Sequence, residues 1–312
     1  MRVSAIDAMW RGVRNLRANW QLILVQALQS FLVTLLGIVG LLPIVLVLGW
    51  GVVRGAASRF GSGGETELLE SIVAAGLPLV FALLVTTLIW ALAFLVYCYL
   101  QAGVLGVLAF GERRARDAGA DARWPHFRDF SVRGFFRRAE SLTWPIFWLL
   151  NLFMLIGLIV FLIFAVIAAL VLVAMVDEGL GVGTVVLGCF GFAVFMILMM
   201  VLSVWMQVAL AELATGRSGV MEATRAGFRT VLRRVPGLAL LFLLLLVGSM
   251  VMAVVVMPLS LALEYLLRGH MATYLAGQGI VTLLQWFLTG ILTIGWSATL
   301  VALVAGEREV AG

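Results

Sequence analysis

The chain has 312 residues, of which 63% are apolar and only 12% are charged, and its mean hydropathy is +1.14. A soluble domain carries about 45–50% apolar and about 25% charged residues, so a soluble interior could not hold this apolar excess. The composition excludes a soluble globular protein. It predicts an all-α integral membrane protein that crosses the bilayer several times.

The positive charge of the chain comes from arginine alone. All 21 basic residues are Arg, against 16 acidic residues, and the formal net charge is +5. A strongly basic chain can bind nucleic acid, but these arginines lie in short segments between long apolar runs. We therefore expect membrane lipids, and not nucleic acid, as their partner. Cys98 and Cys189 each lie inside an apolar run and are expected to be small apolar residues.

Six apolar stretches are long enough to cross a hydrocarbon core of about 30 Å, which needs about 20 residues. None of the six contains Asp, Glu, Arg or His. The predicted spans are about Trp20–Trp50, Pro78–Phe110, Trp144–Val176, Leu180–Leu210, Pro236–Leu263 and Gly277–Ala305. The first is too long for the apolar region of a signal peptide, so we expect it to be retained.

The placement of arginine predicts the orientation. Eighteen of the 21 arginines lie in the N-terminal segment, the second loop, the fourth loop and the tail, all on one side of the six spans. Arg54, Arg59 and Arg268 lie on the other side. The positive-inside rule then puts both termini in the cytoplasm, and we expect the bacterial inner membrane.

A basic amphipathic segment precedes the first, third and fifth spans. In the first copy, Ser4 followed by Asp7 predicts a capping box at the start of a helix. Its apolar stripe is Ile6, Met9, Trp10, Val13 and Leu16. The stripe before the fifth span is Val220, Met221, Thr224, Phe228, Val231, Leu232 and Val235. The middle copy is less regular; the matching cores are Gly12-Val13-Arg14, Gly134-Phe135-Phe136-Arg137 and Gly227-Phe228-Arg229.

A second pattern closes each even-numbered span. Gly111, Gly216 and Gly306 are each followed within two residues by Arg, and glycine is favoured just past a helix end. Pro145 and Pro236 are expected at the first turn of a span, and Pro43 and Pro258 are expected to kink the first and fifth spans. The two patterns together predict one membrane domain, residues 1–312, with three pseudo-repeats at about 1–111, 112–216 and 217–312. Each unit is an interfacial amphipathic helix followed by a transmembrane hairpin.

Such helices lie in the membrane interface with apolar side chains among the acyl chains and arginines on phosphates. Two interpretations stay open: the helices only anchor the hairpins, or they also bind an anionic lipid headgroup or a protein partner. The candidate contact residues are Arg11, Arg14, Arg17, Arg128, Arg133, Arg137, Arg138, Arg225, Arg229 and Arg233.

A resemblance to a known family rests on three short motifs. They are Gly103, Gly111-Glu112 and Trp124-Pro125-His126-Phe127-Arg128-Asp129-Phe130. With the triple pattern, they resemble the membrane domain of some bacterial glycerophosphoryl diester phosphodiesterases and related six-span inner-membrane proteins. In those enzymes catalysis belongs to a separate soluble domain, for which this chain has no room. The resemblance therefore implies a membrane fold without the enzyme activity.

Residue patterns for catalysis, metal binding or cofactor binding are missing from the sequence. His126 and His270 are predicted on opposite faces of the membrane, and without Lys no phosphate-binding G-x-x-x-x-G-K loop can exist. Glu212 and Glu264 lie at predicted span ends, where we expect a headgroup-level residue near Arg217 and a helical pair with Arg268. We expect no enzyme activity and no cofactor.

Neutral polar residues do occur inside the spans: Gln26, Gln29, Gln101, Asn151, Gln207 and Gln285. They are expected to bond neighbouring helices or to line a path. The leading hypothesis is a non-enzymatic inner-membrane protein whose basic cytoplasmic helices engage anionic lipid or a partner. The alternative is the permease subunit of a transporter or exporter that works with a separate ATPase.

Overall fold

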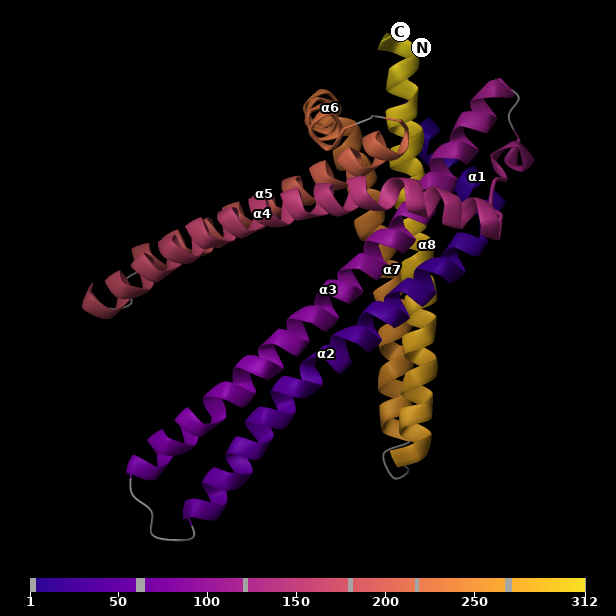
Figure 1. Cartoon of the computed structure of the whole chain (residues 1–312). Coiled ribbons are helices and arrows are strands. Elements are labelled where there is room, and N and C mark those ends of the chain that lie inside the picture. Colours follow the sequence, from indigo (N-terminus) through magenta and orange to yellow (C-terminus); the bar gives the residue numbers. More distant parts are fainter. Residues whose placement is uncertain are drawn as a thin grey trace.

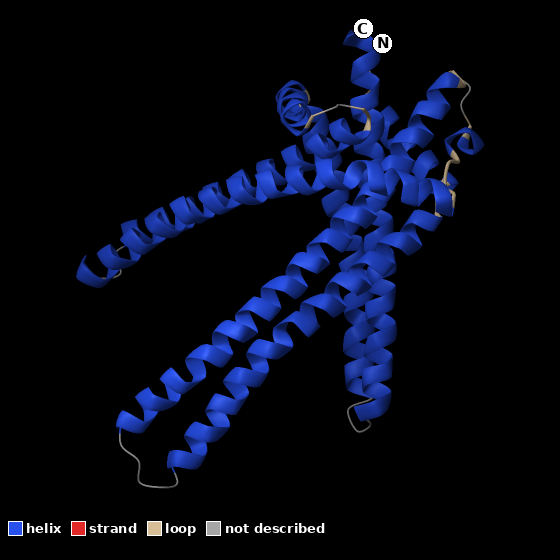
Figure 2. Cartoon of the chain, viewed as in Figure 1, coloured by secondary structure: helices blue, strands red, loops and turns tan. Residues whose placement is uncertain are grey.

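The computed structural model describes residues 4–59, 65–119, 123–178, 182–216, 219–266 and 271–311. Within these ranges the chain is helical with short connections, and no strand occurs (Figure 2). The elements are α1 (Ala5–Ala18), α2 (Gln21–Arg59), α3 (Glu65–Asp117), the short 3-10 helix η1 (Trp124–Phe127), α4 (Val132–Glu178), α5 (Val182–Ala214), α6 (Val220–Arg233), α7 (Val235–Leu266) and α8 (Met271–Ala311). The all-α prediction is confirmed.

Six of these helices, α2, α3, α4, α5, α7 and α8, are long and apolar enough to cross a membrane. The six predicted spans are therefore confirmed by length and composition. The helices are longer than the apolar runs on which the prediction rested. For example, α3 begins at Glu65, whereas the second span was predicted to begin at about Pro78.

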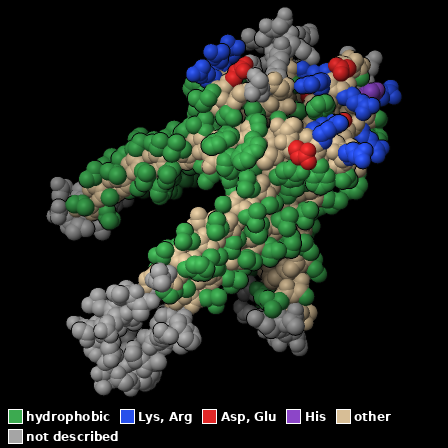
Figure 3. Space-filling view, in the orientation of Figure 1, with side chains coloured by type: hydrophobic (Ala, Val, Ile, Leu, Met, Phe, Trp, Pro, Cys, Tyr) green, Lys and Arg blue, Asp and Glu red, His purple; other side chains and the backbone are tan. Residues whose placement is uncertain are grey.

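The six helices form three hairpins, α2–α3, α4–α5 and α7–α8, which diverge from one common end of the molecule (Figure 1). Both termini lie at this end, which we call the hub. Buried apolar side chains from all six hairpin helices meet there, among them Leu22, Leu105, Leu149, Leu210, Leu238 and Val301. Away from the hub the described helices expose many apolar residues, and the charged side chains that the structure describes gather at the hub (Figure 3).

Two of the three expected amphipathic helices are separate elements, and the middle one is not. α1 and α6 have 14 residues each. Asn19 ends α1 as its C-cap, and Pro236, which has no N–H to donate, follows the end of α6. Residues 132–144 contain no proline or cap, so the middle segment continues into the third span as the start of α4. The interfacial helix predicted for the second unit is wrong in this respect.

The glycine and proline predictions have mixed outcomes. Gly216 has a φ of 111° just after α5 ends, and Pro236 is the second residue of α7, so both are confirmed. Gly111 lies inside α3, which continues to Asp117, and Gly306 lies inside α8. Pro145 lies inside α4, far from its start. The prediction that Gly111 and Gly306 each end a helix is therefore wrong.

Polar residues inside the spans make hydrogen bonds either to a neighbouring helix or to the backbone of their own helix. The Thr86 hydroxyl donates to the Gly40 carbonyl across the α2–α3 hairpin at 2.7 Å. The Gln278 amide donates to Ser260 Oγ between α8 and α7 at 3.4 Å. The Asn151 amide instead bonds the Phe147 carbonyl of its own helix, at 2.8 Å. Thr86 and Gln278 therefore join neighbouring helices, but of the six amides named from the sequence, Asn151 bonds its own helix and the buried amide of Gln29 has no hydrogen-bond partner among the described residues.

Candidate functional site

Helix α1 docks on the hub through small residues. Ala8, Gly12, Asn15 and Ala18 form its buried face, which packs mainly against α8. A Cβ at Gly12 would lie 2.9 Å from the Thr299 Cα, which is closer than side-chain and backbone atoms approach, so glycine is required there. This contact leaves Ile6, Trp10 and Val13 on the outer surface of α1.

Three of the five residues of the predicted apolar stripe of α1 are exposed, whereas Met9 and Leu16 are half-buried against the hub. Ile6 is 54% exposed, Trp10 56% and Val13 44%. The Ser4 hydroxyl accepts the Asp7 N–H at 3.0 Å, and the Asp7 carboxylate accepts the Ser4 hydroxyl at 2.6 Å, so the Ser4 half of the predicted capping box is confirmed. Arg14 and Arg17 are exposed beside the stripe. The outer face of α1 thus combines apolar, aromatic and cationic side chains.

Helix α6 docks in the same way on α5. Ala223, Gly227 and Thr230 are buried, and a Cβ at Gly227 would lie 3.0 Å from the Ala209 Cα. Its exposed apolar residues are Met221, Phe228 and Leu232. Arg225, Arg229 and Arg233 are all exposed as well. Helical spacing puts Arg225, Arg229 and Arg233 along one edge of this exposed apolar stripe, with Arg225 nearest to it.

The two helices correspond residue by residue when Gly12 is matched to Gly227. Four residues earlier, both carry a fully buried alanine, Ala8 and Ala223. Five residues earlier, both carry an acid in the first turn, and three residues later, both carry a buried polar residue, Asn15 or Thr230. The same register therefore leaves the same kind of surface outside. We call the exposed faces of α1 and α6 the interfacial surface.

An ion pair inside the hub joins α1 to α3 and α8. Glu112 is completely buried, and its Oε1 accepts from Arg11 Nε at 2.8 Å and from Arg116 Nε at 3.3 Å. Arg116 also donates to the carbonyls of Ala302 and Ala305 in α8. The Arg11 guanidinium lies 5.9 Å from the centre of the Phe127 ring. Arg11 therefore holds the hub together.

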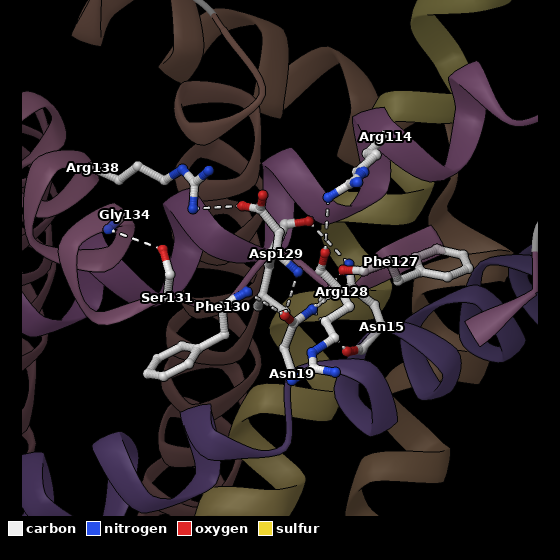
Figure 4. Close-up of polar contacts among 11 residues, drawn as sticks. Asn15, Asn19, Arg114, Phe127, Arg128, Asp129, Phe130, Ser131, Gly134 and Arg138 are labelled. Carbon is white, nitrogen blue, oxygen red and sulfur yellow. Dashed lines mark hydrogen bonds and ion pairs between the residues drawn. The ribbon is translucent and has the colours of Figure 1, made fainter. Parts of the chain in front are cut away.

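A second polar cluster fixes the chain between η1 and α4 (Figure 4). Asn19 is fully buried; its amide donates to the Phe127 carbonyl at 2.8 Å, and its Oδ1 accepts the N–H groups of Asp129 and Phe130, both at 2.9 Å. Asn15 donates to the Leu108 carbonyl of α3 at 3.0 Å. We call Asn15, Asn19 and residues 127–130 the clasp.

Gly111 makes room for the clasp. A Cβ there would lie 2.5 Å from the Phe127 carbonyl oxygen and 3.1 Å from Asn15 Oδ1. Nearby, Arg138 Nη1 lies 2.5 Å from Asp129 Oδ2, and the Arg138 guanidinium lies 4.3 Å from the centre of the Phe110 ring. Arg138, on α4, therefore contacts α3 and the connection between η1 and α4, and its side chain is mostly buried.

The structure divides the ten candidate arginines into two groups. Arg11 and Arg138 form the ion pairs just described. The exposed arginines are Arg14, Arg17, Arg128, Arg133, Arg137, Arg225, Arg229 and Arg233. Three of these are on α6 and two on α1. The second group, and not the first, is available to headgroups or to a partner.

The acidic residues near the span ends differ from expectation. Glu212 is buried, and its Oε1 accepts the Thr230 hydroxyl at 3.2 Å, so it faces α6 and not the headgroups. The sequence analysis did not predict an ion pair at Glu112, although Arg116, four residues later on the same helix, indicates one. The side chain of Glu264 and the whole of His270 lie outside what the structure describes. Among the described residues no group of three His, Cys, Asp or Glu could hold a metal.

A scan against protein-family models and searches of curated proteins and of solved structures return no match for this chain. The resemblance to the membrane domain of glycerophosphoryl diester phosphodiesterases therefore stays a prediction from its motif residues.

Proposed function

We propose that this chain is a non-enzymatic protein of the bacterial inner membrane whose interfacial surface binds anionic lipid headgroups at the cytoplasmic face. The observation that carries the proposal is the way α1 and α6 dock. Their small residues face the hub, whereas Trp10, Val13, Met221 and Phe228 are 44–59% exposed beside arginines. If the helices only anchored the hairpins, we would expect these large apolar side chains to pack against the hub and not to be exposed.

The energetics favour a charged lipid surface. An interfacial helix gains from burying its apolar face and from attraction to anionic lipid, at about 1 kcal/mol for each Arg near the surface. Three arginines on α6 would contribute about 3 kcal/mol. Arg225, beside the apolar stripe, can keep its stem among acyl chains and its guanidinium at the phosphates.

The cytoplasmic location is supported by the distribution of arginine and by the position of the termini. Eighteen of the 21 arginines belong to the segments predicted on the side of the termini, and the structure brings both termini to the hub, where charged side chains gather (Figures 1 and 3). The register shared by α1 and α6 supports an internal repeat with units of about 1–111, 112–216 and 217–312. In the second unit, the clasp and the start of α4 take the place of a separate helix.

Spin-labelled lipids test the proposal on the full chain in vesicles. We expect the immobilised lipid fraction to favour phosphatidylglycerol over phosphatidylcholine by about threefold at 0.1 M salt, and much less at 1 M salt, where the Debye length shrinks to about 3 Å. R225Q/R229Q/R233Q should lower this preference, and R225K/R229K/R233K should keep most of it. Equal association of both lipids with the native chain would contradict the proposal.

A further inference from the structure

A second basic surface lies at the hub, beside the exposed face of α1, with which it shares Arg17, and apart from α6. It consists of Arg17, Arg114, Arg123, Trp124, His126 and Arg128, all exposed, and we call it the basic knob. In Figure 3 it is the group of arginines around the histidine at the upper right. Most of its residues lie on or beside η1, between the end of α3 and the start of α4.

The acids near the knob leave most of its charge uncompensated. Of the acids that the structure describes between Gly111 and Phe130, Glu112 is paired with Arg11 and Arg116, and Asp129 is paired with Arg138. Both pairs lie behind the knob. Asp117 is exposed at the end of α3. The knob therefore presents several guanidinium groups to solvent within a short stretch of chain.

The knob is held in one conformation by contacts on its inner side. Phe127 is 1% exposed, and Asn19 binds the backbone on both sides of Arg128. Arg114 Nη1 donates to the Arg128 carbonyl at 3.3 Å. The Arg17 guanidinium lies 5.7 Å from the centre of the Trp124 ring. A partner would therefore order few groups on binding, which lowers the entropic cost of association.

The knob differs from the interfacial surface in its apolar content. Trp124, at 45% exposure, is its single large apolar side chain among the described residues, whereas α1 alone exposes three. A lone tryptophan among arginines cannot insert as an amphipathic helix does. Tryptophan and arginine are, however, the residues that most often dominate binding energy at protein–protein interfaces.

We propose that the basic knob binds an acidic segment of a cytoplasmic protein. Complementary charge would guide the encounter and fix the orientation, and Trp124 would supply the apolar contact. The inference rests on the cytoplasmic location given under the proposed function. It adds a protein partner at a surface that the lipid contact of α6 does not use.

The test measures binding of a fluorescein-labelled octaglutamate peptide to the full chain in nanodiscs of phosphatidylcholine, by fluorescence anisotropy. R123Q/R128Q keeps the bond from Arg114 to the backbone of residue 128, and should weaken binding about tenfold. The control R229Q/R233Q removes the same charge from α6 and should change the affinity by about twofold or less. W124A should also weaken binding, because the arginine side chains alone supply no apolar contact.

The outcomes separate this proposal from the lipid proposal. R123Q/R128Q should leave the phosphatidylglycerol preference of the spin-label experiment unchanged. No binding of the peptide by the native chain, or equal losses in the two double variants, would overturn the knob as a protein site. Loss of the lipid preference in R123Q/R128Q without loss of peptide binding would also overturn it, because the knob would then be a lipid surface.

Discussion

Replacing Glu112 with alanine is expected to destabilise the protein by about 3 kcal/mol, because it leaves the guanidinium of Arg11 without its buried partner. The Glu112 side chain is 1% exposed and bonds Arg11 and Arg116 at 2.8 and 3.3 Å. Removing one member of a buried ion pair usually costs about 3–5 kcal/mol. The lower value applies here, since the Arg11 side chain is 27% exposed and can turn to solvent.

Unfolding by a denaturing detergent, with the chain in mixed micelles, measures this loss. Glu140 offers a matched control: it is exposed on α4, so its replacement by alanine should change the unfolding free energy by about 0.5 kcal/mol or less. Glu112→Gln keeps an acceptor for Arg11, so its unfolding free energy should lie between those of Glu112→Ala and Glu140→Ala. If Glu112→Ala and Glu140→Ala are equally stable, the ion pair does not hold α1 to the hub.

Gly12→Ala is expected to undock α1 and to destabilise the chain by about 1–3 kcal/mol, as overpacking of a close contact does. The added Cβ would lie 2.8 Å from the Thr299 backbone nitrogen and 2.9 Å from its Cα, and neither atom can rotate away. Gly37→Ala should have the opposite sign, because its Cβ meets nothing within 4 Å and alanine favours helix by about 1 kcal/mol over glycine.

A cysteine at Ala8, which is fully buried, reports directly on undocking. With Cys98 and Cys189 replaced by alanine, its reaction with a maleimide should be slow in the native background and in Gly37→Ala. It should be fast in Gly12→Ala. Equal slow rates in all three would show that α1 tolerates a side chain at this contact.

The local features of the fold could be predicted from the sequence. Runs of about 20 or more apolar residues define the six spans, because their length alone satisfies the bilayer. The helical period of apolar residues found α1 and α6, and the N-terminal cap followed from Ser4 and Asp7. These features depend on neighbours within a few turns of chain.

The contacts that build the hub could not be predicted in the same way. Asn19 bonds Asp129 and Phe130, and Arg11 bonds Glu112, across about 100 residues of sequence. Periodicity also did not show which face of α1 docks. The sequence predicted that the large apolar residues face acyl chains, but it did not show that the face of Ala8 and Gly12 packs closely against the Thr299 backbone. The close contact of Gly111 with the clasp could not be predicted either, because Asn15 is far from Gly111 in the sequence.

The central claim is that the exposed stripe of α6 lies among acyl chains with arginines at its edge. Nitroxide labels at single cysteines, in vesicles containing phosphatidylglycerol and with Cys98 and Cys189 replaced, measure it directly. At Met221, Phe228 and Leu232 we predict strong relaxation by oxygen and little by a water-soluble nickel chelate, with the reverse at Arg229 and Arg233. Equal access of the nickel chelate to all five positions would contradict the claim, because α6 would then stand in water and not in the membrane interface.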